Sequence, residues 1–191
     1  MSRLFFIVLI GIYNSLIFAT EWQVDKECEN LVKFTSSTWA LTFDGVTDRI
    51  DGYIYYEDEN FISSDNELYF EVDLNSIDTG IGKRNRDMRE DYLETDKWPF
   101  THFKGSFQKL KQIDSTVTAF DAVVSGKMFI HGVENEIEIP GLLIVENGRL
   151  HVKAKFIVLL TDYNIEIPQL MILKLDNEIF LTLDFYLKKT Q

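Results

Sequence analysis

The chain has 191 residues and a formal net charge of −12, and 46% of its residues are hydrophobic, with 15 Phe and only 3 Pro. This length suits one domain, and the apolar content excludes a disordered chain. The acidic balance disfavours nucleic acid and anionic membrane surfaces as electrostatic partners.

The first twenty residues have the pattern of a secretory signal peptide. Arg3 supplies a positive start, and an apolar run follows at Leu4–Ile12. A membrane anchor is the alternative, but the run is short for a span of ~20 residues and Asn14-Ser15 interrupts it. We expect a signal peptide at 1–20, one domain at 21–191, no stable membrane span after cleavage, and a periplasmic or secreted location.

Apolar residues at every second position predict strands along most of the domain. Asn147-Gly148 adds a hairpin turn, and the segment 116–129 is apolar on both faces, so it is covered on both sides or faces a cavity. The expected strands, in chain order, are 21–26, 32–36, 39–46, 51–57, 68–74, 101–110, 116–129, 137–145, 150–160 and 179–187.

Two segments interrupt this pattern, and we expect each to close one end of the fold. In the first, Met88, Tyr92 and Leu93 fall at helical spacing, and Trp98-Pro99 stops the helix. In the second, 161–177, proline excludes a central strand. Its apolar residues include Leu170, Met171, Leu173 and Leu175. Strands with two closing segments favour an all-β antiparallel barrel of about eight strands with a short helical cap.

Between residues 72 and 165, the chain carries a set of short motifs in a fixed order. Together they resemble the YceI-like family. The matching segments are Val72–Gly80, Arg86-Asp87, Asp91–Leu93, Lys97–Pro99, Phe103-Lys104, Ser125–Val133 and Asp162–Ile165. The chain departs from the family pattern at Arg89-Glu90, where His-Leu is usual, and at Asn164, which replaces a glycine.

The resemblance implies an extended lipocalin-like barrel, and some members of the family hold a polyisoprenoid in the lumen. We therefore expect an isoprenoid or other lipid ligand, bound by apolar side chains of the lumen and cap. The candidate residues are Phe70, Val72, Leu74, Met88, Tyr92, Leu93, Trp98, Phe103, Phe107, Phe129, Leu170, Met171, Leu181 and Leu183.

Three charged residues beside the cap, Asp78, Arg86 and Asp87, allow two interpretations. They line the open end and meet a ligand headgroup, or they are structural. In the structural alternative, Asp78 caps a turn or the start of the helix, and the other two form ion pairs with the loop.

No motif for catalysis, metal or cofactor binding stands out, so we expect a binding protein that is not an enzyme and uses no cofactor. His102, His131 and His151 lack metal-ligand spacing, and the single Cys28 cannot form an intramolecular disulfide. Two alternatives stay open: a structural or partner-binding barrel with a filled core, and an enzyme on an apolar substrate with His131 or Asp78 as base. A homodimer is left open as well.

Overall fold

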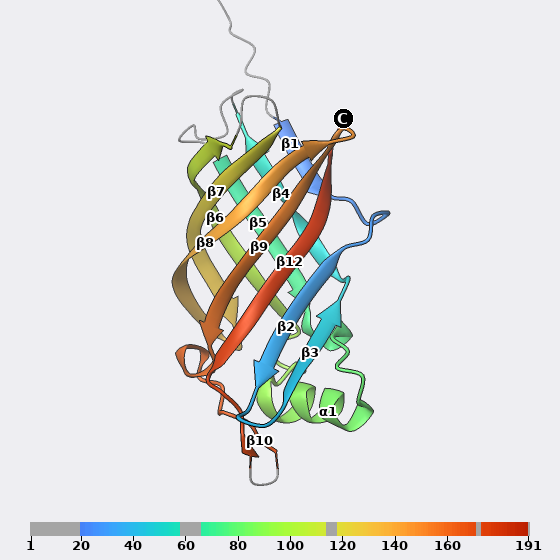
Figure 1. The fold of residues 1–191 in the computed structure, drawn as a ribbon, viewed down its shortest axis with the longest axis vertical. Coiled ribbons are helices and arrows are strands. Elements are labelled where there is room, and N and C mark those ends of the chain that lie inside the picture. The colour runs from blue at the N-terminus through green and yellow to red at the C-terminus, as the bar shows by residue number, and fades with distance from the viewer. Residues whose placement is uncertain (1–19, 58–65, 114–117, 171–172, 191) are drawn as a thin grey trace, which may run out of the picture.

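The computed structural model describes residues 20–57, 66–113, 118–170 and 173–190, so the expected signal segment before Thr20 lies outside the described residues. Eight strands pair antiparallel in the order β1-β4-β5-β6-β7-β8-β9-β12, and β12 pairs again with β1 (Figure 1). The predicted closed antiparallel barrel is confirmed. The strands are β1 (Thr20–Val24), β4 (Ile50–Tyr56), β5 (Asn66–Asp73), β6 (Phe100–Gln112), β7 (Ala119–Ile130), β8 (Val133–Glu146), β9 (Arg149–Leu159) and β12 (Glu178–Lys189).

A two-stranded ribbon extends the sheet outside this ring. It consists of β2 (Leu31–Ser37) and β3 (Thr42–Thr47). One edge of β12 pairs with two different strands. Its last residues pair with β1 of the barrel, and residues 180–184 pair with β2 of the ribbon. The ribbon therefore lies beside the lower half of the barrel, as Figure 1 shows.

Cross-strand register decides which side chains face the lumen, because directly opposite residues lie on the same face of a sheet. Phe185 and Leu187 of β12 are buried, and the alternation carries their face down the strand to Leu183, Leu181 and Ile179. The residues directly opposite these on β9 and β2 lie on the same, inward face of the sheet. The inward residues of these strands match the alternation seen in the sequence.

The predicted helical cap is present and begins at Gly82. A single 3₁₀ turn (Leu74–Ser76) leads into α1 (Gly82–Asp87), and a π-helical turn (Met88–Tyr92) follows directly. Two contacts tie the cap to the ribbon: the backbone groups of Asp78 and Val46 exchange two hydrogen bonds of 2.9 Å, and the Arg84 guanidinium lies 4.0 Å from the Phe43 ring centroid. The cap thus lies against β3 at the lower end of the barrel.

The expected strand 39–46 is corrected by the structure, which begins β3 at Thr42. Thr38 forms a tight turn instead, because its backbone N–H donates to Leu41 O at 2.7 Å and its hydroxyl accepts from the N–H of Leu41 at 3.0 Å. The alternation of Trp39 and Leu41 therefore does not place them in the core. Both side chains are exposed.

The second closing segment is irregular, as its proline predicts. A 3₁₀ turn (Leu160–Tyr163) precedes two short strands that pair only with each other, β10 (Gln169–Leu170) and β11 (Leu173–Lys174). Met171 lies outside the described residues. No helix within the described ranges combines the length and the apolar content needed to cross a bilayer.

Candidate ligand site in the barrel interior

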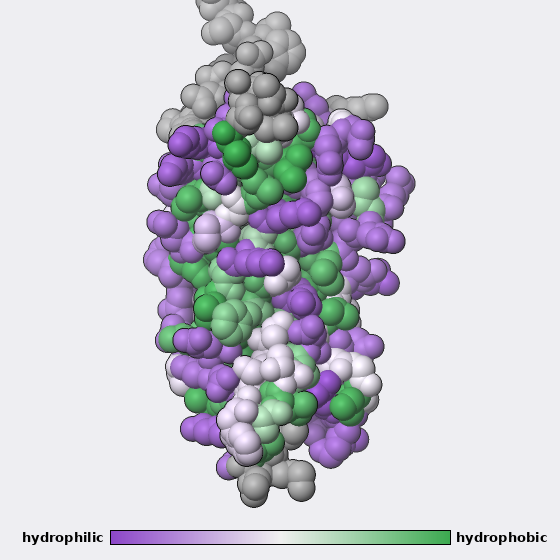
Figure 2. All heavy atoms as spheres, in the orientation of Figure 1, coloured by the Kyte–Doolittle hydropathy of each residue, from purple (hydrophilic) through white to green (hydrophobic). Residues whose placement is uncertain are grey.

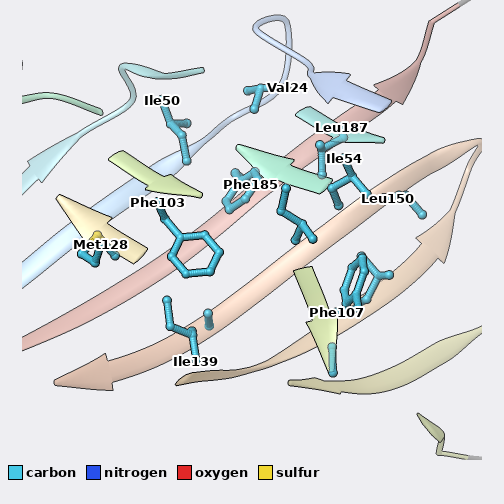
Figure 3. Packing of buried hydrophobic residues seen from close by; sticks show 14 of the residues in the cluster. Val24, Ile50, Ile54, Phe103, Phe107, Met128, Ile139, Leu150, Phe185 and Leu187 are labelled. Carbon is cyan, nitrogen blue, oxygen red and sulfur yellow. The ribbon is translucent and has the colours of Figure 1, made fainter. Parts of the chain in front are cut away.

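The upper half of the lumen is packed by its own side chains. Leu150, Phe185 and Leu187 have 0–1% of their surface exposed, and Ile54 lies beside them in the same cluster (Figure 3). The Phe185 ring also meets Phe70 edge-on, with centroids 5.1 Å apart. These side chains form the most deeply buried part of the core.

Burial is uneven in the lower half, where Phe103, Met128 and Val158 are buried but other inward apolar side chains keep part of their surface exposed. Along β12, burial is complete at Phe185 and Leu187 but only partial at Ile179, Leu181 and Leu183, which share their face. The same partial burial recurs on neighbouring strands. The residues concerned are Val32, Phe34, Phe70, Val72, Ile137 and Phe156. These residues are the inward apolar side chains of the lower half that are only partly buried.

Small residues line one side of the interior. Ala122 lies opposite Gly141, which lies opposite Ala154, so three adjacent strands contribute almost no side chain at this level. A Cβ added at Gly141 would have its three nearest atoms on Lys153 and Ala154, all on the neighbouring strand β9. No side chain from the opposite wall is nearer. A methyl group at this position would thus meet its nearest atoms on the neighbouring strand only.

Several predicted ligand residues share this interior. Phe70, Val72, Phe103, Phe107, Leu181 and Leu183 face inward. From the cap, Tyr92 and Leu93 pack against the core. Leu74 is buried in the turn that leads to the cap, where its N–H donates to Pro99 O at 2.9 Å, and Met88 is half-buried. Leu170 lies on β10, away from the barrel strands.

Two predicted ligand residues, Phe129 and Trp98, lie on the outer surface instead. Phe129 alternates with the buried Met128, and its ring stacks on His102 with centroids 4.8 Å apart. Trp98 meets Phe129 edge-on at 5.7 Å and covers Gly132. Both faces of β7 are apolar, and Trp98 supplies the cover for the outer one. This explains why periodicity alone assigned Phe129 to the lumen.

The contacts of Asp78, Arg86 and Asp87 support the structural alternative. Asp78 accepts hydrogen bonds from Gly80 N at 2.8 Å and Asn85 Nδ2 at 2.7 Å, and the bond from Asn85 is the main cause that lowers the pKa of its carboxyl group. Asp87 pairs with Lys83 one turn earlier and with the adjacent Arg86 at 3.7 Å. These charges hold the cap in shape.

His131 connects the two segments that close the lower end. Its Nε2 lies 3.1 Å from Glu94 Oε2 at the end of the cap, and its Nδ1 lies 3.1 Å from Tyr163 O in the second closing segment. Glu94 also accepts a hydrogen bond from Lys97, which is the main cause that lowers the pKa of its carboxyl group. The His131 side chain therefore links the cap to the second closing segment.

An open groove of about 570 Å³ lies on the outer wall, away from the lumen. Its floor contains Tyr53 and Tyr69, whose rings stack with centroids 6.0 Å apart. Their hydroxyls donate to Glu67 and Glu71, so both phenols are already engaged. Charged side chains such as Lys26, Asp51 and Lys188 also line this open groove, whereas the inward side chains of the barrel are apolar, so the interior suits an apolar molecule better.

Comparisons with known proteins agree with this architecture. The sequence model of the YceI-like domain matches residues 22–187, and no curated protein matches the chain. The fold is similar to that of a polyisoprenoid binding domain from Saccharophagus degradans, at 19% identity and a TM-score of 0.69, with 89% of this chain and 98% of that one covered. It is also similar to Burkholderia cenocepacia BcnA, at 14% identity and a TM-score of 0.68, covering 88% and 99%. The Campylobacter jejuni YceI protein is similar at 15% identity and a TM-score of 0.58, covering 77% and 84%.

Proposed function

The chain belongs to the YceI-like family, and we propose that it is a secreted or periplasmic binding protein that holds a polyisoprenoid or another long lipid in its lumen. The observation that carries the proposal is the change of burial along one face of β12. Phe185 and Leu187 are fully buried, whereas Leu181 and Leu183 on the same face keep exposed surface. An apolar wall left accessible inside a protein is a binding surface for an apolar molecule.

The energetics favour a hydrocarbon over a polar ligand. Burying one methylene contributes ~0.8 kcal/mol, so a five-carbon isoprene unit contributes up to about 4 kcal/mol before ordering and association costs. A few such units bind tightly without any specific polar contact. Asp78 and Asp87 already bind Asn85 and Lys83 within the cap, and this affinity does not need them.

Additional support comes from a structural neighbour. The Saccharophagus degradans domain is described as polyisoprenoid binding, and it shares the fold of this chain over almost its full length. At 19% identity this likeness concerns the fold, so the ligand is proposed here on the inner wall of this chain.

The lipid is tested by native mass spectrometry and organic extraction of the purified protein. Ala154→Leu adds a branched side chain to the row of small lumen residues, and we expect it to lower the amount of bound lipid and the rise in Tm on adding a polyprenol. Ile157→Leu on the outer face of the same strand is the matched control and should leave both unchanged.

A lumen filled by side chains gives the opposite result. Purified protein would then carry no lipid, a polyprenol would not raise Tm, and Ala154→Leu would behave like the control. That result would favour a structural or partner-binding barrel.

A further inference from the structure

The turn that joins β2 to β3 exposes large apolar side chains. We refer to Thr38–Leu41 as the hairpin tip. Trp39 has 84% of its surface exposed, more than any other large apolar residue within the described ranges, and Leu41 has 44%. Leaving two neighbouring large apolar side chains in water is unfavourable, and adjacent exposed apolar residues often mark a contact surface.

The hairpin tip is held in shape by its own hydrogen bonds. Thr38 Oγ1 accepts from Ala40 N at 3.2 Å and from Leu41 N at 3.0 Å. The neighbouring Ser37 is tied to the second closing segment, because its carbonyl accepts from Asp176 N at 2.7 Å and its hydroxyl bonds the Asp176 carboxylate at 2.8 Å. Trp39 is therefore presented on an ordered turn.

The hairpin tip is also uncharged, in a chain with 26% charged residues. No charged residue occurs from Phe34 to Phe43, and the first charges on either side, Lys33 and Asp44, pair with each other at 3.4 Å. A charge still lies beside the tip in space, because the Asp176 carboxylate bonds the Ser37 hydroxyl at 2.8 Å. The uncharged segment that would enter the interface of a bilayer is therefore the tip itself, Thr38–Leu41.

The hairpin tip lies at the lower end of the barrel, beside the cap and the second closing segment (Figure 1). Figure 1 places the β2–β3 turn, α1 and the β10–β11 hairpin together at the lower end. Figure 2 shows pale and green atoms over the middle of this end. Purple, hydrophilic atoms prevail along the sides of the molecule (Figure 2). The apolar tip and the partly exposed inner residues, such as Leu181, thus belong to the same half.

We infer that the hairpin tip enters the interface of an uncharged lipid bilayer and brings the lower end of the barrel to the membrane that supplies its lipid. Trp suits this position, because it has a large apolar body and an N–H that bonds water or headgroups. A net charge of −12 disfavours anionic lipids, whereas the neutral tip approaches zwitterionic lipids without charge repulsion. The inference rests on the proposed function, since a lipid cargo must pass between a membrane and the lumen.

Binding to phosphatidylcholine vesicles, measured by flotation, tests the inference. Trp39→Ala and Leu41→Ala should each weaken partitioning, with the Trp variant losing about tenfold or more, because burying a large apolar side chain contributes ~1.5–3 kcal/mol. Phe180→Ala is the matched control: Phe180 is 46% exposed, close to Leu41, but lies on the barrel wall. It should bind as the wild type does.

The depth to which Trp39 enters the bilayer is measured by quenching of tryptophan fluorescence with brominated phosphatidylcholine. The wild type should be quenched, and Trp39→Phe should lose most of the quenching while it still floats with vesicles. Trp22 and Trp98 remain in that variant and report any general contact with lipid. Absence of quenching in the wild type overturns the inference.

Other outcomes also overturn it. Equal flotation of the Trp39, Leu41 and Phe180 variants excludes the tip as the contact, and a dimer that Trp39→Ala dissociates assigns the tip to a second copy of the chain. Lipid content of the same preparations keeps the two proposals apart. Bound lipid without flotation contradicts only the membrane contact, whereas flotation with an empty lumen contradicts only the lipid-carrying function.

Discussion

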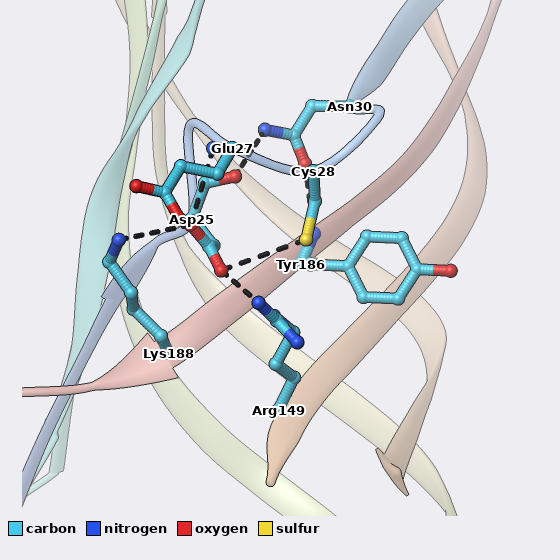
Figure 4. A network of polar contacts seen from close by, with 7 residues as sticks. All are labelled: Asp25, Glu27, Cys28, Asn30, Arg149, Tyr186 and Lys188. Atoms are coloured by element: carbon cyan, nitrogen blue, oxygen red, sulfur yellow. Dashed lines mark hydrogen bonds and ion pairs between the residues drawn. The ribbon is translucent and has the colours of Figure 1, made fainter. Parts of the chain in front are cut away.

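Asp25 and Arg149 join the end of β1 to the start of β9 through a hydrogen bond of 2.8 Å from Arg149 Nε to Asp25 Oδ2. Asp25 is fully buried, and Lys188 reaches its other oxygen at 3.1 Å (Figure 4). The network lies where the edge of β12 changes its partner from β1 to β2, and Asn30 continues it by accepting from Tyr186 N. It therefore stabilises the point at which the barrel closes.

Replacing this carboxylate should weaken the fold. Asp25→Ala removes two charge-assisted hydrogen bonds but leaves Arg149 and Lys188 half-exposed, so both cations regain water. We expect a loss of about 2–3 kcal/mol in the free energy of unfolding, measured by chemical denaturation. Asp51→Ala, which breaks the exposed pair with Lys26, is the control and should change stability very little. Equal effects of the two variants would contradict the role of Asp25.

The same network predicts how stability depends on pH. The hydrogen bond from Arg149, followed by that from Lys188, holds the pKa of Asp25 well below its usual range despite burial. A depressed folded-state pKa gives stability that is complete above the unfolded value, about 3.9, and is lost as pH falls through the folded value. The stability difference between wild type and Asp25→Ala should stay constant above about pH 5 and shrink below about pH 4. A difference that grows on acidification would contradict this assignment.

Alternation in the sequence was enough to predict the barrel and much of its inner face. It succeeded on β12 because this strand has one apolar face, so Leu181 and Leu183 could be assigned. It failed on β7, where both faces are apolar and only the position of Trp98 decides that Phe129 lies outside. Local periodicity contains no information about which side a distant residue will cover.

Two further features depended on contacts that short-range patterns do not contain. Trp39 and Leu41 continue the alternation of β3, but the hydrogen bonds of Thr38 turn the chain before them. The row of Ala122, Gly141 and Ala154 becomes visible only once three strands are in register. A signal was present, since small residues recur at inward positions, but the register that aligns them is set by barrel closure.

The two tyrosines of the outer groove, Tyr53 and Tyr69, can be titrated and compared in the same protein. The Tyr53 hydroxyl donates to Glu67, and this bond, with burial, raises the pKa of Tyr53 to about 12. The pKa of Tyr69 is also about 12, but burial is its larger cause and Glu71 comes second. Glu67→Gln should therefore lower the pKa of Tyr53 toward 10, and Glu71→Gln should lower that of Tyr69 by less. Ultraviolet titration of phenolate, assigned with Tyr53→Phe and Tyr69→Phe, measures both. Equal shifts would contradict this order of causes.

The inner wall also tolerates little added volume where Gly126 of β7 pairs with Gly105 of β6. Gly126 lies opposite Gly105, and a Cβ at Gly126 would lie 2.2 Å from Lys104 O and 2.4 Å from Gly105 Cα. Both are backbone atoms, so Gly126→Ala forces the strands apart, and we expect it to cost about 1–3 kcal/mol. Gly82→Ala is the control, because a Cβ there meets nothing within 4 Å and alanine favours the helix it begins.

Chemical denaturation of the two glycine variants gives the test, and lipid extraction from Gly126→Ala adds a second measurement. If the strands separate to admit the methyl group, the wall beside Ile137 moves and the amount of bound lipid should change together with stability. Gly82→Ala, far from this wall, should keep the wild-type lipid content and be neutral or slightly more stable. A Gly126→Ala protein as stable as Gly82→Ala would mean that β6 and β7 lie further apart than the register requires, and the interior would then be wider at this level.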